Sequence, residues 1–523
     1  MDEGGLGLRS LISINEAVNL KLCWEFLNTD EDWAHILRSR VLRGQKAINH
    51  HIFSSLWSSI KSEMSVIKEN SCWKVGTGHN INLWNDPWCG VPLAQSLHIH
   101  QSVINGLLQQ VSDIILNQQW HIPPSLNHMF PNLKNLVHHI TLPVDCSSDQ
   151  LCWNHSSSGT ISWKLAYEFK RKKLITRHWA RSIWSNDIPP SKSLLVWRLM
   201  HDKLPTDEKL MERGFNLPSM CSICHKFAES TFHLFFECTF AQSIWCWFAS
   251  VLNTSLQFQS IEEIWHLWDN SWSPQCKLSI KAALIYLLNA IWSTRNNARF
   301  NSKVPVWKSA VAWILSNTSL TGNITKCVSS SSIKDFMILK SLNITIHPPL
   351  PPLVKEVVWH PPLEHWVKCN TDGAANNLTS SCAGIFRNHN ADFLCGFAEN
   401  TGLKSAFMAE LCGAMKAIEL AHNRNWSNLW LESDSSLVVK ALSSTSLVSW
   451  ELSNRWLNCT RITRNMNFVV SNVYREGNQC ADRLTNIGLG LDSFTFWNEI
   501  PPHIASFFVD NRLGKPSFRF VRM

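Results

Sequence analysis

Four short motifs in the last third of the chain each contain one carboxylate in a characteristic setting. The motifs are NTDGA at 370–374, AEL at 409–411, ESDS at 432–435 and AD at 481–482, and their acids are Asp372, Glu410, Asp434 and Asp482. Each acid is expected at a strand end or near the start of a helix, so only a fold that joins four elements can bring them together. Four converging carboxylates can hold two divalent metal ions, which lets a protein cut a phosphodiester with water as the nucleophile.

The pattern around these acids predicts an α/β domain. We expect strands at 366–371, 383–387, 393–398, 429–431 and 468–474, and helices at 406–421, 437–442, 450–462 and directly after Asn478. Glu410 falls on the otherwise apolar side of the first of these helices, where an unpaired charge is costly, so a metal ion or a proton is implied. The order is typical of helices packed on a sheet, here a mixed sheet of five strands. A proline-rich linker, PPLPP at 348–352, precedes it.

The earlier part of the chain is predicted to be mainly helical. Helical periodicity covers 14–27, 32–42, most of 164–252 and 261–315, and one helix is expected to start at 204–208. Two β-hairpins are predicted, one pairing 72–75 with 81–84 and one pairing 150–153 with 160–163. The basic run 170–173 (KRKK) is interpreted as a solvated helix face, with a nuclear address or a phosphate contact as the alternatives.

Composition narrows the class of protein. With 523 residues, 45% of them hydrophobic and 17% charged, the chain can bury the cores of three or four domains and is not disordered overall. Its net charge of +8 is compatible with a polyanionic partner. The longest apolar run, 282–292, is too short to cross a bilayer, so no membrane association is expected.

Cysteine usage suggests a reducing compartment. Most of the 17 cysteines have no regular spacing, and the first residues contain no apolar secretory segment. We therefore expect an intracellular protein, with the nucleus favoured over the cytoplasm.

One cysteine group has regular spacing. Cys221, Cys224, His233 and Cys238 form C-x2-C-x8-H-x4-C, a pattern that suits one tetrahedral zinc ion. Four protein ligands leave no open position, so the ion would be structural. His225 and Cys246 are the alternative ligands.

The carboxylate motifs resemble a known family. The segment 366–488 is similar to type 1 ribonuclease H domains of the branch found in plant retroelement-derived proteins, on VKCNTDGA at 367–374, AEL, LESD at 431–434 and REGN at 475–478. The resemblance implies endonucleolytic hydrolysis of the RNA strand of an RNA/DNA hybrid. Asp372, Glu410, Asp434 and Asp482 would then bind two Mg²⁺ ions, and Gly373, Arg475 and Asn478 would contact the substrate.

Two departures from that family leave an alternative open. No histidine lies between Val473 and Asp482, where many bacterial relatives place one, so Arg475 or Glu476 would have to take its place. The segment 443–449 is too short for the extra basic helix that grips the hybrid in some members. The alternative is a catalytically inactive remnant that binds nucleic acid.

The cysteine motif carries a second resemblance. The segment 162–248 is similar to the zinc-binding domain downstream of reverse transcriptases in plant non-LTR retrotransposons, on WRL at 197–199, LPT at 204–206 and FHLFFEC at 232–238. No aromatic residue followed by paired aspartates marks a polymerase palm, so we expect the back half of a retroelement polyprotein. A reverse transcriptase would then act in trans.

The resulting domain plan has five parts. They are a reverse-transcriptase C-terminal connector remnant at 1–150, the zinc-binding domain at 160–250, a helical segment with a Ser/Pro-rich linker at 251–355, the ribonuclease H-like domain at 356–500 and a C-terminal tail at 501–523.

Overall fold

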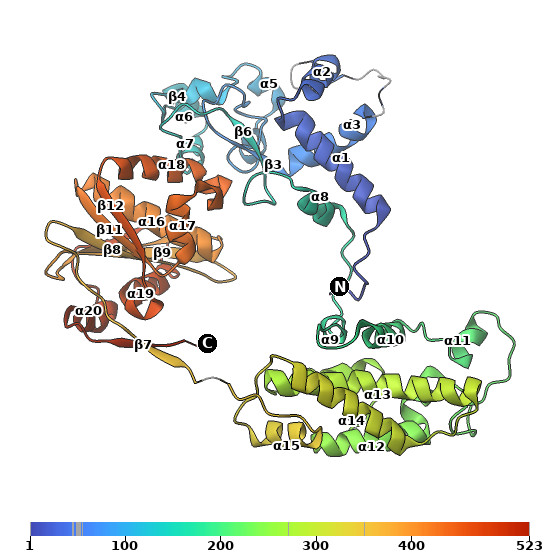
Figure 1. Ribbon diagram of the computed structural model, residues 1–523. Coiled ribbons are helices and arrows are strands. Elements are labelled where there is room, and N and C mark those ends of the chain that lie inside the picture. Colours follow the sequence, from blue (N-terminus) through green and yellow to red (C-terminus); the bar gives the residue numbers. More distant parts are fainter. Residues whose placement is uncertain are drawn as a thin grey trace. The chain divides into compact units, whose positions relative to one another are not determined.

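The chain forms two compact units (Figure 1). The computed structural model describes residues 2–43, 46–48, 54, 56–269, 271–349 and 351–521, so Leu350 of the predicted linker lies outside the described residues. Unit 1 contains 2–9 and 172–351, and unit 2 contains 10–171 and 352–521. No helix in the described ranges is long and apolar enough to cross a membrane. The five predicted domain boundaries stay predictions.

Unit 1 is helical, as the sequence predicted. Its helices are α9 (Ala180–Ile183), α10 (Pro190–Met200), α11 (Asp207–Glu212), α12 (Thr239–Leu252), α13 (Pro274–Asn301), α14 (Trp307–Ile324) and α15 (Ile333–Ser341), with the shorter turns η2 (His233–Glu237) and η3 (Glu262–Asp269). The helix start expected at 204–208 is observed, because α11 begins at Asp207 with Thr206 as its N-cap residue.

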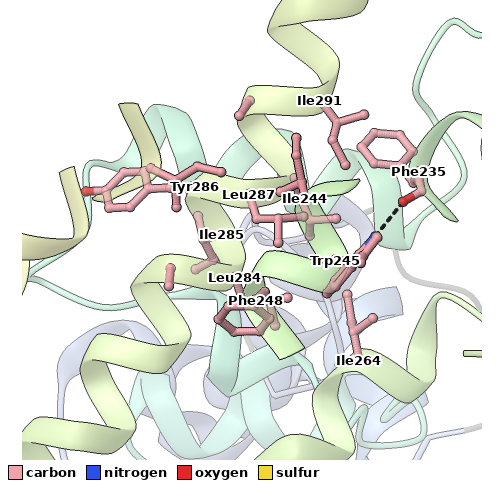
Figure 2. Packing of buried hydrophobic residues seen from close by; sticks show 14 of the residues in the cluster. Phe235, Ile244, Trp245, Phe248, Ile264, Leu284, Ile285, Tyr286, Leu287 and Ile291 are labelled. Atoms are coloured by element: carbon pink, nitrogen blue, oxygen red, sulfur yellow. Dashed lines mark hydrogen bonds between the residues drawn. The ribbon is translucent and has the colours of Figure 1, made fainter. Parts of the chain in front are cut away.

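The core of unit 1 surrounds α13. Every residue from 282 to 291 is buried, because this stretch is apolar on nearly all sides and needs neighbours all round. Figure 2 shows Trp245 and Phe248 of α12 in the same cluster as Leu284 and Ile285 of α13. The Trp245 indole also donates a hydrogen bond to the carbonyl of Phe235 at 2.7 Å. The core therefore runs across residue 250, where the sequence plan places a boundary.

A buried ion network fastens α13 to the loops of unit 1. Arg295 of α13 donates to Glu229 through Nε at 2.9 Å, and both side chains are almost fully buried. Arg299 contacts the buried Asp207 at the start of α11. Charges this deep in a core are tolerated only when they are paired.

The N-terminal part of unit 2 is a helical cluster beside a small sheet. Helices α1 (Leu11–Asn28), α2 (Asp32–Val41), α3 (Trp57–Glu69) and α8 (Trp163–Lys170) lie around one core. The short elements are β1 (Leu42–Arg43), β2 (Lys46–Ala47), α4 (Leu93–Ser96), α5 (Gln101–Ile104), η1 (Val111–Ile114), β4 (Ile115–Leu116), β5 (Gln119–Trp120), α6 (Pro124–Met129) and α7 (Leu133–His138).

Both predicted hairpins are wrong. Strand β3 (Ser71–Lys74) pairs antiparallel with the distant β6 (Gln150–Trp153) instead. The segment expected to turn back after β3 wraps around Asp149, whose carboxylate accepts hydrogen bonds from the N–H groups of Gly76 and Gly78, both at 2.8 Å. After β6 the chain enters α8, capped by Ser162. The long-range pairing of β3 with β6 forms in place of the two local hairpins that the turn residues predicted.

The basic run 170–173 is not a helix face. Helix α8 ends at Lys170, whose ammonium pairs with Glu63 at 2.6 Å. Lys172 and Lys173 are exposed beyond the helix end. The interpretation of this run as a solvated helical surface is therefore wrong.

The C-terminal part of unit 2 is a three-layer α/β domain. Its sheet has the strand order β12-β11-β8-β9-β10-β13, built from β8 (Val367–Ala375), β9 (Ser380–Arg387), β10 (Phe393–Gly402), β11 (Asn428–Ser433), β12 (Asn467–Asn472) and β13 (Thr495–Trp497). Strands β8, β11 and β12 are parallel, and β9 and β10 are antiparallel neighbours, so the sheet is mixed. The five predicted strands are present, and the predicted number is corrected to six because the three-residue β13 adds to the edge at β10.

Helices cover both faces of this sheet (Figure 1). Helices α16 (Ala406–Asn423), α17 (Ser436–Ser443) and α18 (Trp450–Arg464) pack on one face, and α19 (Gln479–Gly488) and α20 (Ala505–Arg512) pack on the other. A turn, η5 (Arg475–Gly477), leads into α19. A separate two-stranded ribbon joins β7 (Leu353–Val357) to β14 (Ser517–Val521). Strand β9 is buried throughout because both faces are covered.

Helix α18 links the two parts of unit 2. The amide of Asn454 donates to the carbonyl oxygens of Val75 and Thr141 at 2.9 and 3.1 Å. Asn458 donates to the carbonyl of Leu142 and accepts from the N–H of Val144, each at 2.9 Å. These bonds satisfy backbone groups of the N-terminal part with side chains of the α/β domain.

The ion network of unit 1 generates a stability prediction. Glu229→Gln removes the nearest counter-charge of the buried Arg295 guanidinium and leaves Asp207, at 3.8 Å, to be shared with Arg299, so we expect a loss approaching the value of about 3–5 kcal/mol typical of a broken buried pair. We expect faster hydrogen exchange in peptides of α13, measured on the full chain by mass spectrometry. Glu262→Gln is the matched control, because its pair with Arg177 is about half exposed on both sides and should change exchange little. Equal exchange in the two variants would contradict the prediction.

Candidate metal centres and active site

Three of the four predicted acids meet at one end of the sheet. The parallel register pairs Thr371 of β8 with Ser433 of β11, so the next residues, Asp372 and Asp434, fall side by side. Glu410 approaches from α16. One carboxylate oxygen of each acid lies within 4.8 Å of one oxygen of the other two.

A close approach of α16 to β8 brings Glu410 to this position. A Cβ atom on Gly373 would lie 2.2 Å from the backbone nitrogen of Glu410, so only glycine allows the contact. The sequence assigned Gly373 to the substrate. The structure instead places it against the backbone of α16, and this packing accounts for the glycine.

Burial and neighbouring carboxylates raise the pKa of all three acids. Burial, followed by the charges of Asp434 and Asp482, raises the pKa of Asp372 to about 7. Burial, followed by the charges of Asp372 and Asp434, raises the pKa of Glu410 to about 9. The pKa of Asp434 is raised as well, chiefly by burial. Like charges in a buried site disfavour ionisation unless a cation compensates them.

The donor set fits a hard divalent cation. Oδ1 of Asp434 is buried and has no hydrogen-bond partner among the described residues, although a buried carboxylate oxygen normally has one. All three side chains offer oxygen atoms, which Mg²⁺ prefers. A cation between them would satisfy the unpaired oxygen and offset the mutual repulsion.

The fourth acid, Asp482, is not in this group and forms an ion pair with Arg475. Oδ1 of Asp482 accepts hydrogen bonds from Nε and from a terminal nitrogen of Arg475, at 3.1 and 2.6 Å. The Arg475 side chain is 72% exposed, so it remains accessible to a polyanion. Asp482 is still near enough for its charge to raise the pKa of Asp372 and Asp434.

Asn478, the third predicted substrate contact, is buried. It stands at the N-cap position of α19, but its side chain does not cap the helix. Its amide donates instead to the carbonyl of Thr371 at 2.9 Å. Asn478 therefore fixes the start of α19, and with it Asp482, against the strand that carries Asp372.

The sequence interpretation missed a row of buried polar residues below the acids. Lys368 pairs with Glu432 at 2.9 Å, and Asn370 donates to the same carboxylate at 3.0 Å. Arg387 of β9, also buried, donates to the side-chain oxygen Oδ1 of Asn370 at 2.7 Å. Alternate residues of a strand share a face. The polar residues at positions 368, 370 and 372 of β8, and at 432 in β11 and 434 directly after it, were therefore the signal available in the sequence.

The second predicted metal site is in unit 1. The ligand atoms of Cys221, Cys224, His233 and Cys238 all lie within 4.8 Å of one another. Cys221 and Cys224 come from a loop, His233 begins η2, and Cys238 stands at the junction of η2 with α12. The alternative ligands, His225 and Cys246, are exposed and are not in this group.

The distances suit a tetrahedral zinc ion. The sulfur atoms of Cys221 and Cys238 are 4.0 Å apart, and Sγ of Cys224 lies 3.4 Å from Nε2 of His233. Ligands at typical zinc distances would be about 3.8 Å apart for two sulfurs and about 3.6 Å apart for sulfur and imidazole nitrogen. Glu237 stands 3.7 Å from the other ring nitrogen of His233, where it can help orient the ring.

Comparison with known proteins matches two segments of the chain. Residues 162–245 match the family described as zinc-binding in reverse transcriptase, and residues 370–488 match the family described as reverse transcriptase-like. The chain carries a reverse-transcriptase zinc-binding domain and a ribonuclease H-like domain. A "Putative ribonuclease H protein" of Arabidopsis thaliana is 25% identical over 553 residues, covering 100% of this chain and 84% of that protein.

Two solved structures were also found for the ribonuclease H-like domain. RNase H1 from Halobacterium salinarum is 21% identical and covers 24% of this chain and 97% of that one, with a TM-score of 0.22. LC11-RNase H1 in complex with an RNA/DNA hybrid is 20% identical and covers 24% of this chain and 96% of that one, with a TM-score of 0.22. The fold assignment rests instead on the sheet order and helix layers given above.

The acid cluster of the ribonuclease H-like domain generates a pH prediction. A carboxyl whose pKa is raised by folding keeps its proton longer in the folded state, so stability falls as pH rises from about 4 to about 9. In the metal-free protein, Asp372→Asn should therefore raise the melting temperature at pH 8, by about 5 °C, and change it least at pH 4.

Asp492→Asn is the control for this measurement, because Asp492 is an exposed acid of the same domain. It should leave the pH dependence of the melting temperature unchanged. Excess Mg²⁺ should stabilise the unmutated protein more than Asp372→Asn. A pH profile identical in all three proteins would refute the electrostatic account.

The zinc-binding domain generates a metal prediction. The full chain should purify with about one equivalent of zinc, measured by atomic absorption, because four matched ligands form a closed site. Cys221→Ser combined with Cys224→Ser should lose it. Cys246→Ser removes an exposed thiol of the same unit and should retain it. Zinc loss in the control alone would reverse the ligand assignment.

Proposed function

We propose that the ribonuclease H-like domain hydrolyses internal phosphodiester bonds in the RNA strand of RNA/DNA hybrids with two Mg²⁺ ions. The observation that carries the proposal is the convergence of Asp372, Glu410 and Asp434 from three separate elements within 4.8 Å. The raised pKa of each of these acids supports it, because perturbed carboxyl groups that converge in this way are typical of functional sites. The family match and the Arabidopsis relative support the choice of reaction.

The residues of the active site would have separate roles in the reaction. Asp372, Glu410, Asp434 and Asp482 would hold the two Mg²⁺ ions, which activate the attacking water and stabilise the leaving 3′ oxygen. With a pKa of about 7 and about 9, Asp372 and Glu410 must lose protons as cations bind, so Mg²⁺ affinity should rise with pH. Recognition of RNA would rest on its 2′-hydroxyls.

Arg475 and Asn478 would position the fourth ligand. Asn478 anchors the start of α19 on the carbonyl of Thr371. Arg475 holds Asp482 through an ion pair that a substrate phosphate can displace, because guanidinium binds carboxylate and phosphate in the same bidentate manner. Displacement would release Asp482 toward the metal site when substrate arrives. In this way Arg475 would take the place of the absent loop histidine.

We infer that Cys221, Cys224, His233 and Cys238 hold one structural zinc ion. Four protein ligands leave no position for water, so the ion would stabilise loops of unit 1 and take no part in hydrolysis. Derivation from a retroelement is supported by the match to the zinc-binding family of reverse transcriptases, and a plant source is supported by the Arabidopsis relative. A reverse transcriptase acting in trans and a nuclear location stay predictions.

A second candidate function is nucleic-acid binding without turnover. The observation that favours it is the Arg475–Asp482 ion pair, which keeps the fourth acid outside the group of three. If this pair persists in the complex, only three acids are available to two cations.

A cleavage assay separates the two functions. The full chain with Mg²⁺ should cut a labelled RNA/DNA hybrid and leave a DNA duplex of the same sequence intact. Asp372→Asn should slow cleavage by more than about 100-fold, because loss of a direct metal ligand exceeds the usual effect of a residue that only supports one. Asp492→Asn should cut at the unmutated rate.

The two candidate functions predict different outcomes of the cleavage assay. Hybrid binding without cleavage by the unmutated chain would support the second candidate. Equal cleavage by the unmutated chain and by Asp372→Asn would indicate a contaminating nuclease and remove the support for this active site.

A further inference from the structure

The ribbon of β7 and β14 lies outside both family matches but packs against the loop that carries Arg475. Gln479 at the start of α19 donates to the hydroxyl of Ser517 in β14 at 3.2 Å. On the other strand, a Cβ atom added to Gly477 would lie 3.1 Å from a methyl group of Val357. Segments from the two ends of this part of the chain, 353–357 and 517–521, therefore meet beside the loop from β12 to α19.

The ribbon presents two cations to this loop. The antiparallel register places Lys355 directly opposite Arg519. Both charged groups lie over the ring of Tyr474, at 4.6 Å for Lys355 and 4.8 Å for Arg519, and Lys355 also donates to the Tyr474 hydroxyl at 2.9 Å. Tyr474 is the residue before Arg475, so the ring that both cations cover is next in the chain to the residue that pairs with Asp482.

This cationic patch is defined as Lys355, Tyr474, Arg475 and Arg519, and two of its three cations already have a carboxylate partner. Glu476 pairs with Arg519 at 3.1 Å, and Asp482 pairs with Arg475. Glu356 points to the opposite side of the ribbon, because neighbouring residues of a strand alternate. Like charges directly opposite each other on paired strands are unfavourable unless an anion joins them.

The segment that forms a basic helix in some ribonuclease H relatives is short and uncharged in this chain. The segment between α17 and α18, residues 444–449, contains no lysine or arginine. Two arginines of α18 are already engaged, Arg455 with Glu419 at 2.7 Å and Arg461 with Asp145 at 2.5 Å. The ribbon can therefore add phosphate contacts to those of α18, which also carries Arg464.

We propose that the cationic patch of the β7–β14 ribbon binds the phosphodiester backbone of the hybrid and so supplies the grip that the missing basic helix would provide. This inference rests on the proposed function, since it assigns a substrate contact to the same active site. A phosphate at the patch would lie beside Arg475 and so compete for the guanidinium that holds Asp482. Binding at the ribbon and release of the fourth acid would then be coupled.

The test measures hybrid binding by the full chain without cleavage. Asp372→Asn serves as the background, and fluorescence anisotropy with a labelled hybrid gives the affinity over a range of salt concentrations. Lys355→Gln combined with Arg519→Gln should weaken binding about tenfold near 0.1 M salt. The slope of log affinity against log salt should become shallower by about 1 to 2, because each lost phosphate contact removes about 0.9.

Arg512→Gln combined with Lys515→Gln is the matched control. It removes the same amount of charge from two exposed side chains in the same C-terminal segment, each paired with an aspartate. The control should weaken binding less than about twofold and leave the salt slope unchanged. Equal weakening by both double variants would show a general charge effect and overturn the proposal.

A further variant separates binding from folding. Lys355→Arg combined with Arg519→Lys keeps both charges and should restore the salt slope. A ribbon with only a structural role would lower the melting temperature and leave the slope unchanged, which would overturn the proposal. Because cleavage is measured separately on the unmutated chain, a patch that binds hybrid in a chain that does not cleave would refute the enzyme and leave the patch standing.

Discussion

The parallel pairing of β8 with β11 determines both where the acids lie and which of them have a charged partner. It lines up one polar row along one face of two adjacent strands, from Lys368 and Glu432 to Asp372 and Asp434. At the inner end, Glu432 is balanced by Lys368 at 2.9 Å. At the outer end, Asp372, Glu410 and Asp434 form no ion pair with the described residues, and their pKa values rise although Arg475 partly opposes the rise for Glu410 and Asp434. The compensated half of the row is structural, and the uncompensated half is where a divalent cation fits.

The loop from β12 to α19 controls the remaining parts of this site. Asn478 anchors the loop to β8, Arg475 holds Asp482, and Tyr474 connects the loop to the ribbon. One short segment therefore couples the fourth acid to a surface suited to phosphates. Substrate binding and completion of the metal site would be two consequences of one displacement, the transfer of Arg475 from a carboxylate to a phosphate.

Unit 1 also contains buried polar side chains, in its cysteine–histidine group and in its ion network. Its predicted zinc ligands come from a loop and from the two ends of η2, and the residues between those ends, Leu234 to Phe236, are buried in the core of the unit. The Glu229–Arg295 pair ties another part of these loops to α13. A closed metal site and a buried ion pair thus hold irregular segments against a helix that is itself buried by its apolar surface.

The sequence by itself determined the helices and strands with strong periodicity, the identity of the acids and the spacing of the zinc ligands. These features are local, because periodicity and spacing depend on neighbours along the chain. Only the tertiary structure decided the pairing of β3 with β6, the sixth strand, the packing role of Gly373 and the capture of Asp482 by Arg475. Each of these depends on partners brought close by folding: Asp149 organises 76–80, α16 approaches Gly373, and the ribbon closes on Tyr474. Local sequence encodes which groups are present, and long-range packing decides which of them meet.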